Sequence, residues 1–196
     1  MTIDNSKLIA EFIPENDDGD TFLYTEMLDR SKRKGNNGLR LMKTFYHRSR
    51  DEFWNQLPTI QKLCDLSETR AYTRLSPRSF KKVGRLFTAL VVDCAMSENW
   101  AGMKSLYNKA CGNVSPNEKF WIFDVDKITD KTNEFVDLLI KDQFFRARIP
   151  SKKGEHIITI PFDSRKIILN NNWSEFGEIS LHKDNPTNLY IPEGAE

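Results

Sequence analysis

The sequence predicts an α+β protein in which an N-terminal αβ module packs on a C-terminal sheet. Three observations support this fold class. Apolar residues recur at helical spacing in some segments and alternate with polar residues in others. The 196 residues fit one domain, or two modules that share a core. The second half places several strand-length segments around a single helical one, which is typical of a split βαβ arrangement.

The first half begins with a helical segment, SKLIAEFI, and a polar turn. Two strands are then expected, TFLYTEML and LRLMKTFY, joined by SKRKGNNG. The Gly and Asn residues of this connection adopt positive φ at little cost, which favours a hairpin. A helix should follow with Ser49 as its cap, because apolar residues recur at helical spacing: Phe53, Leu57, Ile60 and Cys64.

Residues 70–75, RAYTRL, alternate as a strand does, with Arg70, Tyr72 and Arg74 on one face. Ser76 and Pro77 predict the start of the next helix, since serine caps helices and proline is favoured at the first helical position. An apolar stripe from Phe80 to Val91 supports that helix. A further helix is expected over 99–111, ending at Gly112.

Five strands and one capped helix are expected in the second half. The helix is TDKTNEFVDLLIKD, and the strands are KFWIFDVD, FFRARIP, EHIITIPF, GEISLH and TNLYIP. The segment DSRKIILNNN is compatible with either structure. This order, β-α-β-β-(α)-β, is that of an RNA-recognition-like (split βαβ) sheet. We expect 118–192 to form one antiparallel-rich sheet, with the helix at 130–142 packed on it through Phe135, Leu138 and Leu139.

The organisation along the chain follows from these elements. We expect an N-terminal extension over 1–20, an αβ module with basic segments over 21–115, and an RNA-recognition-like module over 116–196. The best candidate boundary is Ser115-Pro116-Asn117, because Pro and Asn are typical of connections. The two modules are not expected to fold apart.

Composition points to a soluble protein of a reducing compartment. The three cysteines are isolated and form no C-x-x-C pair, which indicates buried thiols and argues against a zinc site. No apolar run approaches the roughly 20 residues that span a bilayer. The acidic N-terminus lacks the basic and apolar regions of a secretory signal. A cytoplasmic protein with no membrane association is therefore expected.

Charge is unevenly distributed although the formal net charge is only +1. Residues 1–30 are rich in acids, whereas 31–50 and 69–92 contain Lys and Arg and no acid. Such asymmetry favours a basic face that contacts phosphates. The candidate nucleic-acid contacts are Arg33, Lys34, Arg40, Arg74, Arg78 and Lys82. The alternative is a solvated surface whose charges are balanced by the acidic N-terminus.

Asp124 and Asp126 end the strand KFWIFDVD. Side chains alternate across a strand, so both carboxylates face the same side, roughly 6 to 7 Å apart. Two such carboxylates repel each other unless a cation offsets their charge, and hard divalent ions beside phosphates are held in this way. The structural alternative is that Asp126 only begins the turn DKITD.

Two further segments carry groups that suit phosphate chemistry. In Ser151-Lys152-Lys153-Gly154-Glu155-His156, Gly154 permits close backbone approach, the lysines offer charge, and Ser151 and His156 offer hydrogen bonds. The alternative is a flexible hairpin with a half-buried histidine. Asp184 precedes the turn signal Asn185-Pro186, and its alternative role is to cap that turn.

Taken in order and spacing, these segments resemble the three motifs of the archaeo-eukaryotic primase-polymerase superfamily. The resemblance implies that Asp124, Asp126 and Asp184 bind Mg²⁺ or Mn²⁺ as the catalytic set. It implies that Ser151, Lys152, Lys153, Gly154 and His156 bind the phosphates of a nucleoside triphosphate. The implied catalytic module is the RNA-recognition-like one. Two other segments, RAYTRLSPRSFKKV and HKDNPTNLY, resemble small phage-encoded proteins, which implies a host cytoplasm.

The resemblance predicts template-directed nucleotidyl transfer on DNA or RNA, with replication proteins as possible partners. Two features depart from the family. Only twelve residues follow Asp184, and no zinc knuckle is present. The alternatives are a catalytically inactive nucleic-acid-binding module of the same fold and a metal-dependent nuclease, which needs similar carboxylates but not the Ser-to-His segment.

Overall fold

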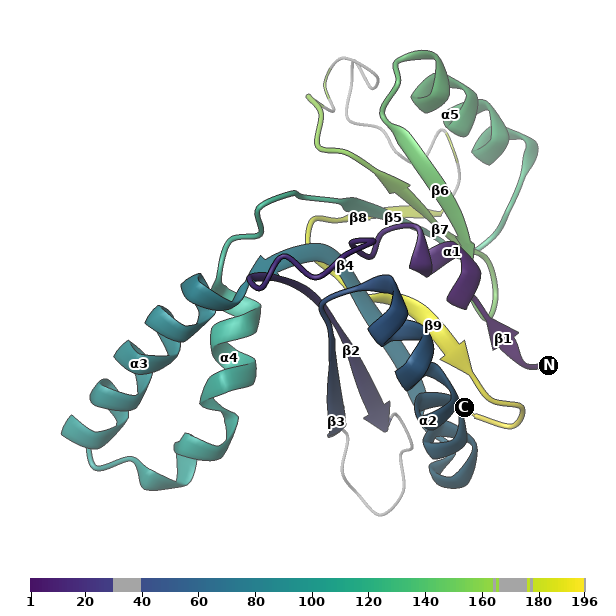
Figure 1. Ribbon diagram of the computed structural model, residues 1–196. Helices are drawn as coiled ribbons and strands as arrows, with labels where there is room; N and C mark the ends of the chain where they lie inside the picture. Colours follow the sequence, from purple (N-terminus) through teal and green to yellow (C-terminus); the bar gives the residue numbers. More distant parts are fainter. Residues whose placement is uncertain (30–39, 164, 166–175, 177, 196) are drawn as a thin grey trace.

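The computed structural model describes residues 1–29, 40–163, 165, 176 and 178–195. The predicted connection SKRKGNNG and most of DSRKIILNNN lie outside the described residues. Within them the predicted mixed α+β class is confirmed, because helices accompany two antiparallel sheets (Figure 1).

The first sheet joins the two ends of the chain. Its strand order is β1 (Ile3–Asp4), β9 (Thr187–Ile191), β4 (Arg70–Ser79), β2 (Thr21–Asp29) and β3 (Arg40–His47). All four pairings are antiparallel. The sheet therefore takes strands from residues that lie at opposite ends of the sequence.

The second sheet is formed by one continuous part of the chain. Its order is β6 (Phe145–Pro150), β7 (Glu155–Thr159), β5 (Trp121–Val125) and β8 (Ile179–His182), all antiparallel. Between β5 and β6 runs α5 (Asp130–Lys141), which begins with the capping box of Thr129 and Thr132. The predicted strand at 119–126 and the capped helix after it are confirmed.

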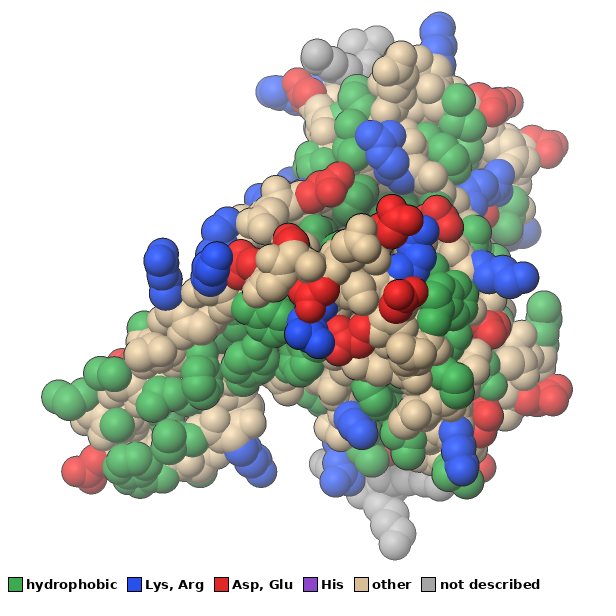
Figure 2. Space-filling view, in the orientation of Figure 1, with side chains coloured by type: hydrophobic (Ala, Val, Ile, Leu, Met, Phe, Trp, Pro, Cys, Tyr) green, Lys and Arg blue, Asp and Glu red, His purple; other side chains and the backbone are tan. Residues whose placement is uncertain are grey.

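The remaining helices cover the first sheet or project from it. The short α1 (Ser6–Ala10) and the long α2 (Arg50–Ser67) lie beside this sheet, and Ser49 caps α2 as predicted. In Figure 1, α3 (Phe80–Met96) and α4 (Leu106–Asn113) extend as an arm, joined through the 3₁₀ helix η2 (Trp100–Ser105). Figure 2 shows hydrophobic side chains over much of this arm.

Three hydrophobic clusters form the core. One joins α1, α2 and the first sheet to the inner face of the second sheet through Ile122, Ile149 and Ile158. Another packs the opposite face of the second sheet on α5 through Phe123 and Phe135, whose rings lie 5.1 Å apart edge to face. The third joins the first sheet to α3 and α4. The two sheets thus share a core and are held as one unit.

Two expectations about the second half are wrong. The strand 187–191 does not extend the second sheet but pairs with β1 and β4 in the first. Leu138 is 38 % exposed, whereas Phe135 and Leu139 are buried. The buried face of α5 follows the i, i+3, i+4, i+7 pattern of Thr132, Phe135, Val136 and Leu139, and Leu138 lies beside it.

The predicted helix start at Ser76 is also wrong. Here β4 continues to Ser79, and Ser79 caps α3 by accepting a hydrogen bond from the backbone N–H of Lys82. The Ser76 hydroxyl instead accepts the backbone N–H of Phe120. Pro77 lies where the β2–β4 register shifts, and proline is tolerated in a strand at such a bulge because no ladder hydrogen bond is needed there.

A chain of buried polar groups crosses the first sheet. The Thr25 hydroxyl lies 2.8 Å from the Nε2 atom of His47 and 2.8 Å from the hydroxyl of Thr73. All three side chains are fully buried. Burial disfavours the charged imidazolium and lowers the pKa of His47 to about 4.

Stability should therefore fall in mild acid. Between the unfolded pKa of His47, about 6.5, and the folded value of about 4, the unfolded chain takes up a proton that the folded chain does not. Lowering the pH from 7 to 4 should cost about 3 kcal/mol of unfolding free energy through this residue. Urea unfolding at several pH values measures the slope, and His47→Gln should flatten it. An unchanged slope in that variant would contradict the assignment.

Candidate functional site

A cavity of about 430 Å³ lies between the two sheets. Strands of the first sheet contribute Arg70, Tyr72 and Asn188 to its wall. The second sheet and its adjoining turns contribute the larger share. The lining residues from that side are Ile122, Asp124, Asp126, Ser151, Lys152, Lys153, His156, His182, Asn185 and Pro186.

Strand alternation places the two aspartates on the cavity. Phe123 and Val125 are fully buried against α5, so the intervening side chains face the other way. Asp124 is half-buried, and Asp126 is exposed just after the strand. The strand pattern therefore presents both carboxylates to the same cavity, in agreement with the alternation of the sequence.

His156 lies directly across the β5–β7 ladder from Asp124. Its Nε2 atom is 3.5 Å from Oδ1 of Asp124, a pair that is ionic when the imidazole is protonated. Its Nδ1 atom is 2.8 Å from the hydroxyl of Thr187, the first residue of β9. The residue is only 9 % exposed. His156 is thus held between an acid of the second sheet and a hydroxyl of the first.

The turn between β6 and β7 closes tightly beside β5. The backbone N–H of Ser151 donates to the carbonyl of Gly154, and the backbone N–H of Gly154 donates to the Ser151 hydroxyl. A Cβ atom on Gly154 would lie 1.8 Å from the carbonyl oxygen of Val125. Glycine is therefore required at position 154 because the turn lies directly against the end of β5. The sequence suggests a different reason, namely close approach of the backbone to a phosphate.

The two lysines of this turn differ in their surroundings. The ammonium group of Lys152 donates to the carbonyl of Ala195 at 2.8 Å, which ties the turn to the C-terminal segment. Lys153 is exposed at the cavity, and no hydrogen bond or ion pair of its side chain occurs with the described residues. Lys153 is thus the more available of the two for an incoming anion.

Asp184 does not line the cavity with the other two aspartates. Its carboxylate forms an ion pair with Arg78, whose side chain is fully buried, and its backbone carbonyl accepts a hydrogen bond from Arg74. It is not among the residues that line the cavity. Within the described residues no group of three His, Cys, Asp or Glu side chains is placed to hold a metal ion. The geometry gives Asp184 a structural role, as the counter-ion of a buried arginine.

The candidate nucleic-acid contacts are distributed unevenly between surface and interior. Arg78 is fully buried, and Arg74 pairs with Glu26, so neither guanidinium is free to meet a phosphate backbone. Arg40 and Lys82 are exposed. Arg33 and Lys34 lie outside the described residues. On the face shown in Figure 2, basic and acidic side chains are interspersed and do not form one basic surface.

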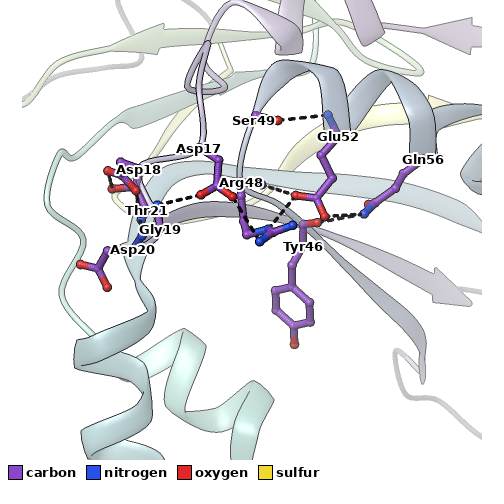
Figure 3. Close-up of polar contacts among 10 residues, drawn as sticks. All are labelled: Asp17, Asp18, Gly19, Asp20, Thr21, Tyr46, Arg48, Ser49, Glu52 and Gln56. Atoms are coloured by element: carbon purple, nitrogen blue, oxygen red, sulfur yellow. Dashed lines mark hydrogen bonds and ion pairs between the residues drawn. The ribbon is translucent and has the colours of Figure 1, made fainter.

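The acidic N-terminal segment is engaged locally (Figure 3). Asp17 pairs with Arg48 at 3.1 Å, and Arg48 also pairs with Glu52. Asp18 accepts hydrogen bonds from the hydroxyl and backbone N–H of Thr21, and these lower its pKa to about 2. These carboxylates stabilise the entry into β2 and the first turn of α2, so the acids of this segment have structural partners.

Several cavity residues were not anticipated as site residues. His182 of β8 lies opposite Ile122 in the β5–β8 ladder, and its Nε2 atom is 3.1 Å from the Ser180 hydroxyl. Arg70 and Tyr72 belong to the other sheet. Alternation in RAYTRL places these two on one face, which is the signal that the sequence offers for them. No local pattern in the sequence indicates that this face of the strand lines the same cavity as Asp124.

Comparison with family models, with curated proteins and with solved structures gave no match. Within the described part of the chain, no helix combines the length and the apolar character that crossing a membrane requires. The inference of function therefore rests on the cavity and its residues.

Proposed function

We propose that this protein is a metal-dependent nucleotidyltransferase of the primase-polymerase type, which uses nucleoside triphosphates and a DNA or RNA template. The observation that carries the proposal is that Asp124, Asp126, the turn 151–153 and His156 line one cavity. These segments are separated in sequence and meet through the β5–β7 pairing. A volume of about 430 Å³ falls within the roughly 300–1,000 Å³ of ligand sites.

Asp124 and Asp126 are the residues that would hold Mg²⁺ or Mn²⁺. Their oxygens are the hard ligands that these ions prefer, and both face the cavity. Such an ion would offset phosphate charge and act as a Lewis acid toward phosphoryl oxygens. His182 is a further ligand-type side chain on the cavity wall. Asp184 is left out of this set because its carboxylate neutralises Arg78.

The turn 151–153 and His156 are suited to binding phosphates. Lys153 supplies an exposed ammonium group, and the Ser151 hydroxyl lies at the base of the turn. Electrostatic groups fixed in position stabilise developing charge without reorganisation. Thr187 orients His156 through its Nδ1 atom, so that the Nε2 edge faces Asp124.

The second sheet supports the RNA-recognition-like part of the proposal. Both β5 and β6 are antiparallel to β7, which lies between them, and α5 connects β5 to β6. Two parallel strands joined through a helix and separated by a third strand form a split βαβ unit. We assign template binding to the exposed basic side chains, of which Arg40 and Lys82 belong to the described residues. The proposed partners are replication proteins. The proposed location is the cytoplasm, which is that of the host cell if the protein is phage-encoded.

A second function is favoured by one observation. With Asp184 paired to Arg78, two carboxylates remain on the cavity, where the resemblance implied three. A catalytically inactive nucleic-acid-binding module of the same fold would tolerate this arrangement. The two proposals differ in whether nucleotide binding depends on a divalent ion.

The test combines binding with incorporation. Wild-type protein should bind Mn²⁺ together with a nucleoside triphosphate in calorimetry and extend a primed template. Asp126→Ala should lower incorporation at least about a hundredfold, because removal of a metal ligand costs several kcal/mol of transition-state stabilisation. Binding to the template strand should remain largely intact.

Asp142→Ala is the matched control, since it removes an exposed acid at the end of α5 and should change neither quantity. Nucleic-acid binding without metal-dependent nucleotide binding would support the inactive module. Equal loss of incorporation and nucleic-acid binding in Asp126→Ala would also contradict the enzymatic proposal.

A further inference from the structure

Arg70 stands out among the buried arginines of the described residues. Its side chain lines the cavity, the residue is only 9 % exposed, and its buried Nε atom has no hydrogen-bond partner. No ion pair of Arg70 with a described acid is found. By contrast, the buried Arg78 pairs with Asp184, and the half-buried Arg148 pairs with Glu155.

An unpaired buried guanidinium is costly, because desolvation of the charge is not offset by a counter-ion. A ligand that supplies the missing anion would offset this cost. The planar guanidinium matches the oxygens of a phosphate, to which it can donate two parallel hydrogen bonds. The position of Arg70 on the cavity wall makes such a ligand accessible to it.

The other charges of the cavity restrict the ligand further. Asp124 and Asp126 lie on the wall contributed by the second sheet, whereas Arg70 comes from the first. A simple anion would be attracted to Arg70 and Lys153 but repelled by the aspartates. A polyphosphate that carries a divalent cation satisfies both sets of charges.

We infer that Arg70 is a phosphate-binding residue, which contacts the polyphosphate chain of the ligand from the first sheet while the aspartates hold its metal from the second. This inference rests on the proposed function and adds to it a residue from the opposite wall. Ligand binding then bridges the two sheets across the cavity.

The first experiment measures binding of inorganic tripolyphosphate by calorimetry, with Mn²⁺ and with EDTA. Arg70→Met should weaken binding about tenfold to a hundredfold in both conditions, as expected for a lost charge-assisted pair. Arg70→Lys keeps the charge but loses the planar group that donates two parallel hydrogen bonds, so its affinity for tripolyphosphate should be intermediate. Arg146→Met is the control, because Arg146 is exposed on β6 and donates to backbone carbonyls.

A second readout separates ligand binding from a structural role. Removal of an unpaired buried charge should leave the melting temperature of ligand-free Arg70→Met equal to or above that of the wild type. It should also abolish the upward shift that tripolyphosphate gives the wild type. A lower melting temperature with unchanged tripolyphosphate affinity would overturn the inference and make Arg70 a structural residue.

The arms of the experiment also separate this inference from the proposed function. If Asp126→Ala leaves Mn²⁺-dependent binding unchanged while Arg70→Met lowers tripolyphosphate affinity, the metal proposal fails and the phosphate role of Arg70 stands. Unchanged tripolyphosphate affinity in Arg70→Met, with Asp126→Ala impaired, overturns the role of Arg70 alone. A single-stranded oligonucleotide tests the other source of phosphate, and loss of that binding alone would overturn assignment to a polyphosphate.

Discussion

Substitution of Asp184 by alanine is expected to destabilise the protein by about 3 kcal/mol, although the residue lies in a turn and is partly exposed. The reason is Arg78, whose fully buried side chain pairs with the Asp184 carboxylate. The Nε and Nη1 atoms of Arg78 donate to the carbonyls of Cys111 and Ser76, which do not neutralise its charge. Without Asp184 a buried charge is left uncompensated. Urea unfolding at pH 7 measures the difference.

The same experiment distinguishes this structural role from that of a metal ligand. If Asp184 were held beside Asp124 and Asp126 by a cation, its removal in the absence of metal would relieve repulsion and leave stability unchanged or raised. Asp126→Ala serves as the comparison and should behave in that way. The double variant Arg78→Met with Asp184→Ala should recover much of the loss, because no unpaired charge remains. An Asp184→Ala protein as stable as the wild type would refute the ion-pair argument.

Those elements whose signals are local could be predicted from the sequence. Alternation in KFWIFDVD predicts both the strand and the face on which Asp124 lies, because the apolar Phe123 and Val125 pack into the core on the other face. The caps at Ser49 and Thr129 likewise depend on hydrogen bonds to residues three positions away. In each case the chemistry lies within one turn or one strand.

Prediction failed where a distant residue decided the outcome. Ser76-Pro77 has the local form of a helix start, but pairing of Arg78 with Phe22 in the first sheet keeps the chain extended. The role of Asp184 depends on Arg78, which is 106 positions away. Neither partner can be inferred from the spacing of neighbouring residues.

One wall of the cavity could not be predicted from the sequence, for a similar reason. The element order of the sequence predicts the strand 187–191 in the second sheet, whereas it lies between β1 and β4 in the first. That pairing brings Thr187 to His156 and Asn188 to the cavity, with Arg70 and Tyr72 from β4. Motif spacing could identify one wall, but the opposite wall depends on how the two sheets pack together.

Substitution of Gly154 by alanine is expected to cost about 3 kcal/mol, at the upper end of what overpacking usually costs. The added Cβ atom would lie 1.8 Å from the carbonyl oxygen of Val125 and 2.9 Å from the carbonyl carbon of Asp126. Both are backbone atoms of β5 or its end and cannot rotate away, so the turn 151–154 must lift from the strand. Displacement of Ser151 and Lys153 should then weaken tripolyphosphate binding as well.

Gly84→Ala is the matched control for this prediction, because the same methyl group is added within α3 and, apart from its chain neighbours and the backbone of its own helix, would meet no atom within 4 Å. Alanine favours a helix over glycine, so this variant should gain up to about 1 kcal/mol. Urea unfolding of both variants therefore gives opposite signs if close contact with β5 is the cause. A Gly154→Ala protein that unfolds like the wild type would show that the turn can move off β5 freely. In that case β5 does not fix the position of Ser151 and Lys153 at the cavity.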